Sequence, residues 1–340
     1  MSHQTVIAIL NYNGKKHLET YLPSVVKHSG NTHIVVIDNA STDDSVNFLK
    51  TTYPQIELVE NLQNYGFAGG YNKGLEKIKA TYFVLLNSDV EVTEGWLDAP
   101  LKTLAKKNVA AVQPKIRAWA NRAYFEHAGA SGGYIDKYGF PFCRGRMFDT
   151  AEKDEGQFDN ATEIFWATGA CMFIKADLFF EAGGFDNDFF AHMEEIDLCW
   201  RLQLMGYKIM VEPSAVVYHL GGGTLGYMSP FKTRLNFRNS LYLLQKNVQR
   251  NRFGILFKRL TWDGVAGVRF LLHGNFSHFW AVLRSHVEFY SHLGRNRKKR
   301  KLFAHKIKID PNAPLTGMYY KSVVRGYFLK KKKHFKDYDI

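Results

Sequence analysis

The first third of the chain alternates short apolar runs with helix-like stretches, and this alternation limits the possible folds more than any other feature. Five apolar runs, at residues 5–10, 33–37, 56–60, 81–86 and 109–112, are predicted to be strands. Helical stretches of roughly 10–15 residues separate most of them, a spacing typical of βαβ units. Strands connected in this way form a parallel sheet with helices on both faces. The sequence therefore predicts a Rossmann-like α/β fold.

The rest of the chain carries a weaker pattern. Residues 115–160 are predicted to form irregular loops or hairpins. A strand at 170–174, a helix at 194–205, short strands at 208–211 and 215–218, and a helix at 230–251 are predicted to follow. The apolar window 264–283 contains Arg269 and His273, which argue against a membrane span.

Charge divides the chain into two parts. The net charge is −7 over residues 1–220 and +20 over residues 221–340. The basic runs at 295–301 and 330–333 are interleaved with aromatic residues, which suits an anionic lipid surface, a nucleic acid or a solvated basic face. We expect one domain over residues 1–225 and a basic helical region over residues 226–340.

Cysteine usage and the amino terminus predict the compartment. The three cysteines, Cys143, Cys171 and Cys199, have neither paired nor metal-type spacing and lie among apolar neighbours. No signal-peptide pattern precedes the first strand. Reduced core cysteines and a cytoplasmic location are the expectation.

Polar side chains follow three of the predicted strands. They are Asn11 and Asn13; Asp38 and Asn39; and Asn87, Ser88 and Asp89. Ligands of such sheets bind at the carboxyl ends of strands. Asp38 is suited to accept hydrogen bonds from a nucleobase or ribose, with a turn and helix cap as the alternative. Asp89 is suited to bind a Mg²⁺ or Mn²⁺ ion that phosphates and water also coordinate, with a surface turn as the alternative.

Three further segments carry candidate groups. The glycine-bearing loop at 64–74 opens a helix whose N–H groups suit an anion, although a purely structural loop explains it equally well. Helix 194–205 begins with Glu194, Glu195 and Asp197, and a carboxylate in such a partly apolar setting is suited to act as a general base. A helix-dipole role or an Asp197–Arg201 ion pair is the alternative. His219 ends a strand and is a candidate metal or phosphate contact.

Together these segments resemble the family 2 (GT-A fold) glycosyltransferases, especially the bacterial rhamnosyltransferase-like branch. The matching segments occur in the family's order and cover about residues 5–225. They are residues 9–13, 36–43, 64–72, 85–89, 166–170, 183–186, 194–201 and 219. The resemblance implies a mixed, mainly parallel sheet flanked by helices, to which the charge and composition of the later residues add a helical, basic C-terminal extension.

The resemblance also implies roles. Asp38 would contact the base of the donor nucleotide, and Asp89 would bind Mn²⁺ or Mg²⁺ together with His219. Glu195 would deprotonate the acceptor hydroxyl during inversion, supported by Glu194 and Asp197. The other residues expected at the donor are Asn11, Asn13, Asn39, Asn64, Gly66, Gly69, Asn72, Asn87, Ser88 and Arg201.

The sequence departs from the family pattern at two positions. Asn87 replaces the first acid of the usual Asp-x-Asp motif, so metal binding rests on Asp89 and His219. Glu194–Glu195 replaces the usual Glu-Asp pair, which leaves the base between two glutamates. A sugar-phosphate nucleotidyltransferase and a non-catalytic membrane- or nucleic-acid-binding protein on a degenerate transferase fold are the rival functions.

The partners follow from the resemblance. The donor would be dTDP-rhamnose or a UDP-sugar, and the acceptor a glycan or lipid-linked glycan of bacterial cell-surface polysaccharide synthesis. The Gln-x-x-Arg-Trp motif of processive synthases is absent from the sequence, which favours transfer of a single sugar. The basic region is then expected to bind the inner face of the cell membrane, and no nucleic acid is expected.

Overall fold

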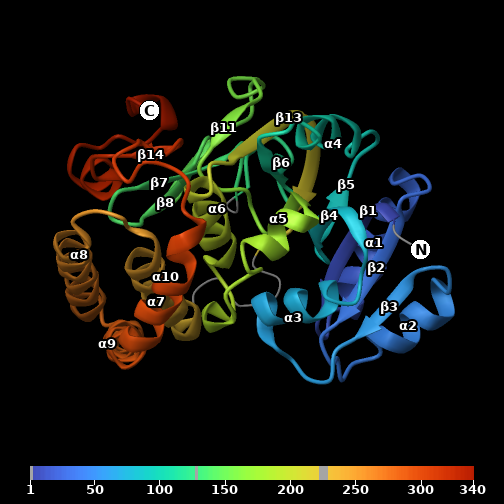
Figure 1. The fold of residues 1–340 in the computed structure, drawn as a ribbon, viewed down its shortest axis with the longest axis horizontal. Helices are drawn as coiled ribbons and strands as arrows, with labels where there is room; N and C mark the ends of the chain where they lie inside the picture. The colour runs from blue at the N-terminus through green and yellow to red at the C-terminus, as the bar shows by residue number, and fades with distance from the viewer. Residues whose placement is uncertain (1–2, 127–128, 222–228) are drawn as a thin grey trace.

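The computed structural model describes residues 3–126, 129–221 and 229–340. Its centre is a nine-stranded sheet in the order β11-β13-β6-β12-β4-β1-β2-β3, with β5 paired to β13 (Figure 1). The strands of this sheet are β1 His3–Asn11, β2 His33–Asp38, β3 Glu57–Glu60, β4 Ala80–Asn87, β5 Val90–Val92, β6 Val109–Ala118, β11 Thr162–Ile164, β12 Cys171–Lys175 and β13 Lys208–His219. Strands β4-β1-β2-β3 and the pair β6–β13 are parallel, whereas β12 runs antiparallel between them. The predicted mixed, mainly parallel sheet is confirmed.

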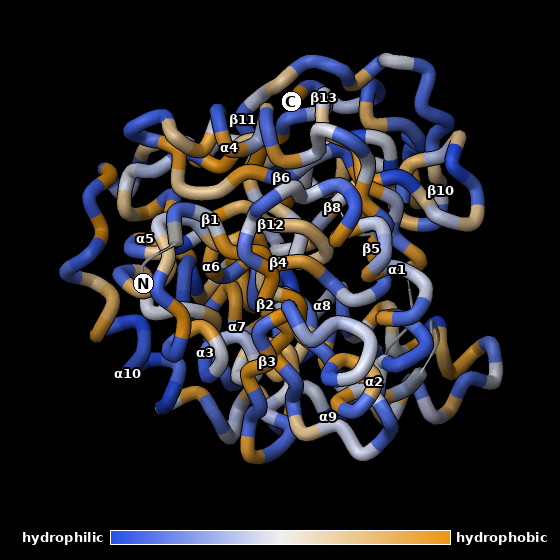
Figure 2. The backbone as a smooth tube through the Cα atoms, turned by 90° about the vertical axis from the view of Figure 1, so that its right-hand side faces the viewer, coloured by the Kyte–Doolittle hydropathy of each residue, from blue (hydrophilic) through white to orange (hydrophobic). Residues whose placement is uncertain are grey.

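Both faces of the sheet are buried, which is why its strands are almost continuously apolar. In β1, Val6 and Ala8 pack into one hydrophobic cluster, whereas Ile7 and Ile9 pack into the other. Hydrophobic strand segments accordingly gather in the middle of the molecule (Figure 2). The cluster that contains Ile7 also includes residues of α1 Lys15–His28, α2 Ser45–Thr52 and α4 Asp98–Leu104. The cluster that contains Val6 also includes residues of α3 Gly66–Leu75, α5 Ala176–Glu181, α6 Glu194–Leu204 and α7 Pro230–Asn247.

The C-terminal region is helical only in its first part. Helices α8 Arg252–Leu272, α9 Phe276–Ser291 and α10 Leu293–Phe303 follow α7. The chain then returns as β14 Met318–Tyr319, which pairs in parallel with β7. The resulting five-stranded sheet also contains β7 Gly133–Asp136, β8 Pro141–Cys143, β9 Arg146–Met147 and β10 Thr150–Ala151. Short helical turns complete this segment at Ala304–Lys306, Arg325–Leu329 and Phe335–Asp337.

Tyr319 and Tyr338, near the C-terminus, belong to the same hydrophobic cluster as Val6 of β1. The described parts of the two expected domains therefore share one core. The expected boundary at residues 225/226 lies outside the described residues.

Two predicted elements differ from the structure. The helix predicted at residues 71–79 spans Gly66–Leu75, and it begins early because a carbonyl from the segment before α6 accepts hydrogen bonds from its first turn. The two short strands predicted at 208–211 and 215–218 are one strand, β13, with an irregular register between Glu212 and Val216. A bulge of this kind interrupts the apolar pattern without ending the strand.

Across the described chain, none of the helices combines the length and apolar character that crossing a membrane requires.

Candidate active site

Asp89 and His219 lie side by side because β5 pairs with the end of β13. The chain leaves β4 at Asn87, turns, and enters β5 with Val90 opposite His219. The backbone carbonyl of Asp89 accepts a hydrogen bond from the Leu220 N–H at 3.1 Å. The His219 Nε2 atom then lies 3.2 Å from Asp89 Oδ1. The fold thus joins the two residues that were expected to share a metal.

A second carboxylate holds the other nitrogen of His219. Glu126 Oε2 lies 3.1 Å from His219 Nδ1, and all three side chains are buried. Burial lowers the pKa of an imidazole, but Asp89 and Glu126 outweigh this effect and raise the His219 pKa to about 10. Although burial acts in the opposite direction, His219 in turn holds the pKa of Asp89 below its ordinary value. No sequence motif marks Glu126, which lies in the irregular region after β6.

Asp89 and His219 have side chains that suit a divalent cation whose remaining coordination positions are filled by a bound diphosphate and water. A histidine that binds a metal commonly donates its other N–H to a carboxylate, and Glu126 occupies that position. Within the described residues, no group of three or more His, Cys, Asp or Glu side chains could hold a metal by itself. A Mg²⁺ or Mn²⁺ ion shared with a diphosphate needs only one or two protein ligands. The residues present therefore fit such an ion.

Asn11 and Asp38 form a buried polar cluster where β1 and β2 end. Asn11 Nδ2 donates to Asp38 Oδ1 at 3.0 Å, and the Ser41 hydroxyl donates to the same oxygen at 2.6 Å. Asn11 Oδ1 is buried, and no atom of the described chain bonds to it. A Cβ on Gly14 would lie 2.4 Å from that oxygen, so glycine leaves it room. Asn11 Oδ1 is thus a buried acceptor of this cluster that has no partner in the described chain.

Asn13 and Asn39 connect the strand ends to neighbouring loops. Asn13 Oδ1 accepts hydrogen bonds from Thr42 N at 2.7 Å and Asp43 N at 3.2 Å. Asn39 Nδ2 donates to Asn64 Oδ1 at 2.9 Å and to the Gly66 carbonyl at 3.0 Å. Asn13 thus binds the loop after β2, and Asn39 binds the loop that contains Asn64. These contacts hold the edge of the sheet where Asn11 and Asp38 lie.

The glycine-bearing loop contacts protein where an anion was expected. The Phe67 and Ala68 N–H groups in the first turn of α3 donate to the Phe190 carbonyl, at 2.8 and 3.3 Å. Gly66 has a φ of +72°, and a Cβ on it would lie 2.5 Å from Phe190 Cδ2. Gly69 is similarly confined, because its Cβ would lie 2.8 Å from Tyr65 Cβ. The loop packs closely against the segment that precedes α6.

Asn72 joins α3 to that same segment. Its Nδ2 donates to the Phe185 carbonyl and to Asn187 Oδ1, both at 2.7 Å, and its Oδ1 accepts from the Phe185 N–H at 3.0 Å. Asn87 and Ser88 are half-buried at the end of β4, where the Asn87 N–H donates to the Ala170 carbonyl at 3.0 Å. Asn72 is thus occupied by protein contacts, whereas among the described residues no hydrogen bond engages the Asn87 side-chain amide.

Glu194 and Glu195 begin α6 with enclosed carboxylates. Glu194 is buried and Glu195 is half-buried, and within the described chain Oε2 of each has no hydrogen-bond partner. Burial raises the Glu195 pKa to about 7, against the opposing effect of nearby backbone N–H groups. Burial and the Glu195 charge raise the pKa of Glu194 well above its ordinary value. A carboxylate with a pKa near neutrality is suited to accept a proton.

Asp197 and Arg201 point into the protein. Asp197 Oδ2 accepts from Arg201 Nε and from Lys246 Nζ, each at 2.9 Å, and Asp197 Oδ1 accepts from Asn247 Nδ2 at 2.7 Å. Arg201 also donates to the backbone carbonyls of residues 182 and 184. Although burial opposes it, Lys246 and Arg201 hold the Asp197 pKa below its ordinary value. The two residues join α6 to α7 and to the segment after α5.

The loop before Glu194 has a strained backbone. Phe190, His192 and Met193 have φ angles of +63°, +70° and +72°, which L-residues rarely adopt. The buried Asn239 of α7 holds this loop. Its Nδ2 lies within hydrogen-bonding distance of the carbonyls of Phe189, Ala191 and His192, at 3.0, 2.9 and 2.7 Å. No motif identifies Asn239, because its partners lie about fifty positions away in the chain.

Basic residues of the C-terminal helices hold the beginning of the same loop. Lys246 of α7 and Lys299 of α10 both donate to Asp186, and Lys299 also donates to Asp188 Oδ2 at 2.6 Å. Arg295 donates to Asp188 Oδ1 at 2.9 Å. Part of the positive charge of the C-terminal region therefore neutralises the acidic segment that leads into α6.

The fold is that of the GT-A glycosyltransferases. Two solved structures are similar to it, each at 16% identity. The structure of GalNAc-T7 with UDP, GalNAc and Mn²⁺ has a TM-score of 0.56, over 74% of this chain and 49% of that one. The mannosyltransferase PcManGT from Pyrobaculum calidifontis bound to GDP-Man and Mn²⁺ has a TM-score of 0.50, over 88% of each chain.

The chain belongs to glycosyl transferase family 2, whose model matches residues 6–175. It is 24% identical over 311 residues to the N-acetylglucosaminyl-diphospho-decaprenol L-rhamnosyltransferase of Mycobacterium tuberculosis, covering 86% of this chain and 95% of that protein. It is also 32% identical over 95 residues to the rhamnosyltransferase WbbL of Escherichia coli K12, covering 27% and 35%. The predicted family and its rhamnosyltransferase-like character are confirmed.

Proposed function

We propose that this glycosyltransferase inverts the anomeric centre as it moves one sugar from a nucleotide-diphosphate donor to an acceptor hydroxyl. The observation that carries the proposal is the enclosed Glu195 carboxylate, whose Oε2 lacks a partner within the described chain and whose pKa is raised to about 7. In the reaction the acceptor oxygen bonds to the anomeric carbon, and the bond from that carbon to the donor phosphate breaks. Glu195 takes the hydroxyl proton, and the nucleoside diphosphate leaves.

The donor is proposed to lie at the mouth formed by β1, β2 and β4. Asp38 and Asn11 would contact the nucleotide, with Asn11 Oδ1 left free by the described chain as an acceptor. Asp89 and His219 would hold Mn²⁺ or Mg²⁺, which would neutralise charge on the leaving diphosphate. Glu126 would orient His219 through Nδ1. Both Mn²⁺-containing structural neighbours support a divalent ion.

The proposed donor is dTDP-rhamnose or a UDP-sugar, and the proposed acceptor is a glycan or a lipid-linked glycan. The names of the two rhamnosyltransferase relatives support this choice, and the mycobacterial protein is named for a lipid-linked acceptor. Residues 1–225 would carry the chemistry. Residues 226–340 would bind the inner face of the cell membrane from the cytoplasm, where the acceptor is displayed.

A panel of nucleotide sugars incubated with and without Mn²⁺ tests the proposal through release of UDP or dTDP. We expect metal-dependent release from one donor, increased by a matching acceptor. Asp89→Ala should abolish turnover and weaken donor binding in Mn²⁺. Pyrophosphate release from a sugar phosphate and an NTP would instead show a nucleotidyltransferase. Binding without turnover of any donor would show a degenerate transferase fold.

A further inference from the structure

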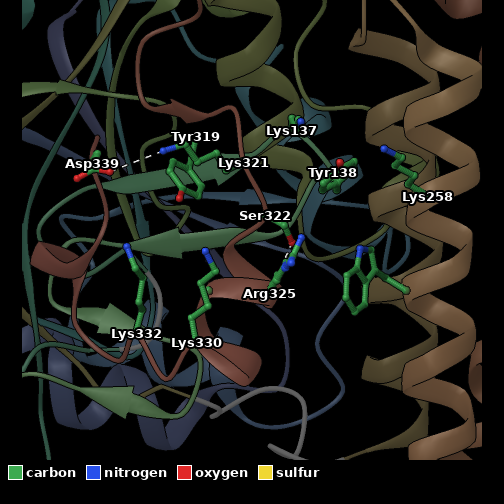
Figure 3. A pocket seen from close by; sticks show the side chains of 12 residues that line it. Lys137, Tyr138, Lys258, Tyr319, Lys321, Ser322, Arg325, Lys330, Lys332 and Asp339 are labelled. Atoms are coloured by element: carbon green, nitrogen blue, oxygen red, sulfur yellow. Dashed lines mark hydrogen bonds and ion pairs between the residues drawn. The ribbon is translucent and has the colours of Figure 1, made fainter.

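A basic pocket of about 680 Å³ lies between α8, the small sheet and the C-terminal segment. None of its lining residues belongs to the candidate active site. Figure 3 shows these side chains converging from the β7–β8 turn, from α8 and from residues 319–339. They are Lys137, Tyr138, Lys258, Trp262, Tyr319, Lys321, Ser322, Arg325, Gly326, Lys330, Lys332 and Asp339.

The pocket brings together six cationic side chains and one carboxylate. Asp339 lies 3.7 Å from Lys321 Nζ, and both side chains are largely exposed. Within the described chain, no ion pair engages Lys258, Arg325 or Lys330. Cations that converge without carboxylate partners repel one another and attract anions. The charge of the pocket is therefore complementary to a ligand with one or more phosphate groups.

Buried contacts hold the walls of this pocket in place. Asp136 at the end of β7 accepts hydrogen bonds from Tyr138 N at 2.9 Å and from Val323 N at 3.0 Å. Arg259 of α8 donates to the Gly139 carbonyl at 3.0 Å. These bonds join the turn, the C-terminal segment and the helix that carry the cations. The walls of the pocket are thus anchored to the folded core.

The pocket opens beside an apolar ridge on α8. Positions 253, 257, 265, 268 and 272 lie on one side of the helix, and positions 258, 262 and 269 lie beside them. The ridge residues are exposed: Phe253 85%, Phe257 64%, Val265 54%, Val268 53% and Leu272 79%. The exposed Phe328 and Leu329 extend the apolar surface from the C-terminal segment, where Arg269 lies 5.6 Å from the Phe328 ring centroid.

We propose that the pocket binds the phosphate headgroup of an anionic phospholipid while the α8 ridge enters the outer part of the bilayer. Apolar side chains in the interface and cations on headgroup phosphates are the two contributions that hold a peripheral protein on a membrane. Charge complementarity and the adjoining ridge select a lipid over a soluble anion, which would leave the ridge in water. This headgroup site rests on the proposed function, because it specifies how the membrane named there would be bound. Lipid binding itself does not require that the protein transfer a sugar.

Co-sedimentation of the full-length protein with vesicles tests the pocket. Vesicles of phosphatidylcholine alone are compared with vesicles that also contain phosphatidylglycerol. The test variant is Lys258→Glu/Arg325→Glu/Lys330→Glu. The control is Lys27→Glu/Lys79→Glu/Lys102→Glu, which makes the same charge change at exposed lysines of the catalytic domain. We expect the test variant to lose at least about tenfold in partitioning to anionic vesicles and the control less than about threefold. Equal losses would show general attraction and overturn the proposal.

A second variant, Phe257→Ser/Leu272→Ser, tests the ridge. Salt at about 0.5 M screens the headgroup attraction, so the binding that remains should depend on apolar insertion. We expect this variant to lose that salt-resistant binding and to keep an unchanged far-ultraviolet circular dichroism spectrum. Salt-resistant binding equal to that of the wild-type protein would show that the ridge does not enter the membrane.

Two further measurements separate the possible sources of phosphate. Pyrophosphate that stabilises the wild-type protein and prevents vesicle binding at micromolar concentration would indicate a soluble ligand and overturn the lipid proposal. Pocket-dependent binding to an RNA oligonucleotide in preference to anionic vesicles would do the same. Donor hydrolysis in the absence of vesicles should be equal in the test variant and the wild-type protein. Pocket-dependent vesicle binding with no hydrolysis by either protein would sustain the lipid site and reject only the proposed function.

Discussion

Two carboxylates of α6, two residues apart, have opposite environments. Glu195 Oε2 is enclosed without a partner in the described chain, and the Glu195 pKa is raised to about 7. Asp197 is more deeply buried, yet Lys246, Arg201 and Asn247 bind it and its pKa stays low. A carboxylate neutralised by two cations does not accept a proton near neutral pH. These environments support the proposed proton transfer by Glu195, whereas Asp197, later in the first turn of α6, holds the helix in place.

Replacing the unpartnered carboxylate should have the largest effect on activity. Glu195→Gln keeps the side-chain shape but removes the proton acceptor, so we expect transfer to fall by about 10²–10⁴-fold. Donor affinity should change little, because the donor is proposed to bind at the strand ends. Product formation and calorimetric donor binding measure the two effects. Glu194→Gln is the control, and a greater loss of transfer in this variant would move the base to Glu194.

Removing the paired carboxylate should instead affect folding. Asp197→Ala leaves Arg201 as a buried cation without its carboxylate partner and leaves Lys246 with Asp186 alone, so the free energy of unfolding should fall by about 3–5 kcal/mol. Urea unfolding followed by fluorescence gives this quantity. Asp44→Ala, which breaks an exposed ion pair with Lys15, should leave the free energy of unfolding almost unchanged. Similar small losses in both variants would contradict the structural role of Asp197.

The residue that holds the strained loop should affect turnover more than substrate binding. Asn239→Leu removes the amide that faces three loop carbonyls, and Asn239→Asp removes the same donor at constant volume. Each should reduce kcat by about 10–100-fold through misplacement of Glu195, with a smaller change in donor KM. If Asn239 only fills space, Asn239→Asp would keep wild-type kcat.

The strand-end half of the site could be predicted from sequence because periodicity alone locates it. Asp38 and Asp89 follow apolar runs, and parallel strands bring such ends to one edge of the sheet. Glu126 could not be found in this way, since it meets His219 only because β13 pairs with β6 and the chain returns beside β6 at residues 124–126. The positions of α3 and its glycine loop were also decided by a distant group, the Phe190 carbonyl.

The same limit applies to the basic C-terminal region. Its charge pattern predicted an anionic partner, but Lys246 and Lys299 bind acids of this chain instead. The helical prediction holds through α10, whereas β14 depends on pairing with β7, more than 180 residues earlier in the chain. Local propensity contains no information about a two-residue strand whose stability comes from its partner.

The pH dependence of the wild-type enzyme tests the difference between Glu195 and Asp197 most specifically, through the smallest expected effect. Because Glu195 must be deprotonated, the transfer rate should fall about tenfold for each pH unit below pH 7.

The unfolded chain loses this proton near the ordinary pKa of 4.5, whereas the folded chain keeps it to about pH 7. The folded state therefore binds more protons between these pH values, and the Glu195 contribution to stability decreases as pH rises through that window. Relative to the wild-type protein, Glu195→Gln should become more stable from pH 4.5 to 7, with no further gain above it. A constant stability difference across the window would show that the carboxylate is solvated and leave α6 without its proton acceptor.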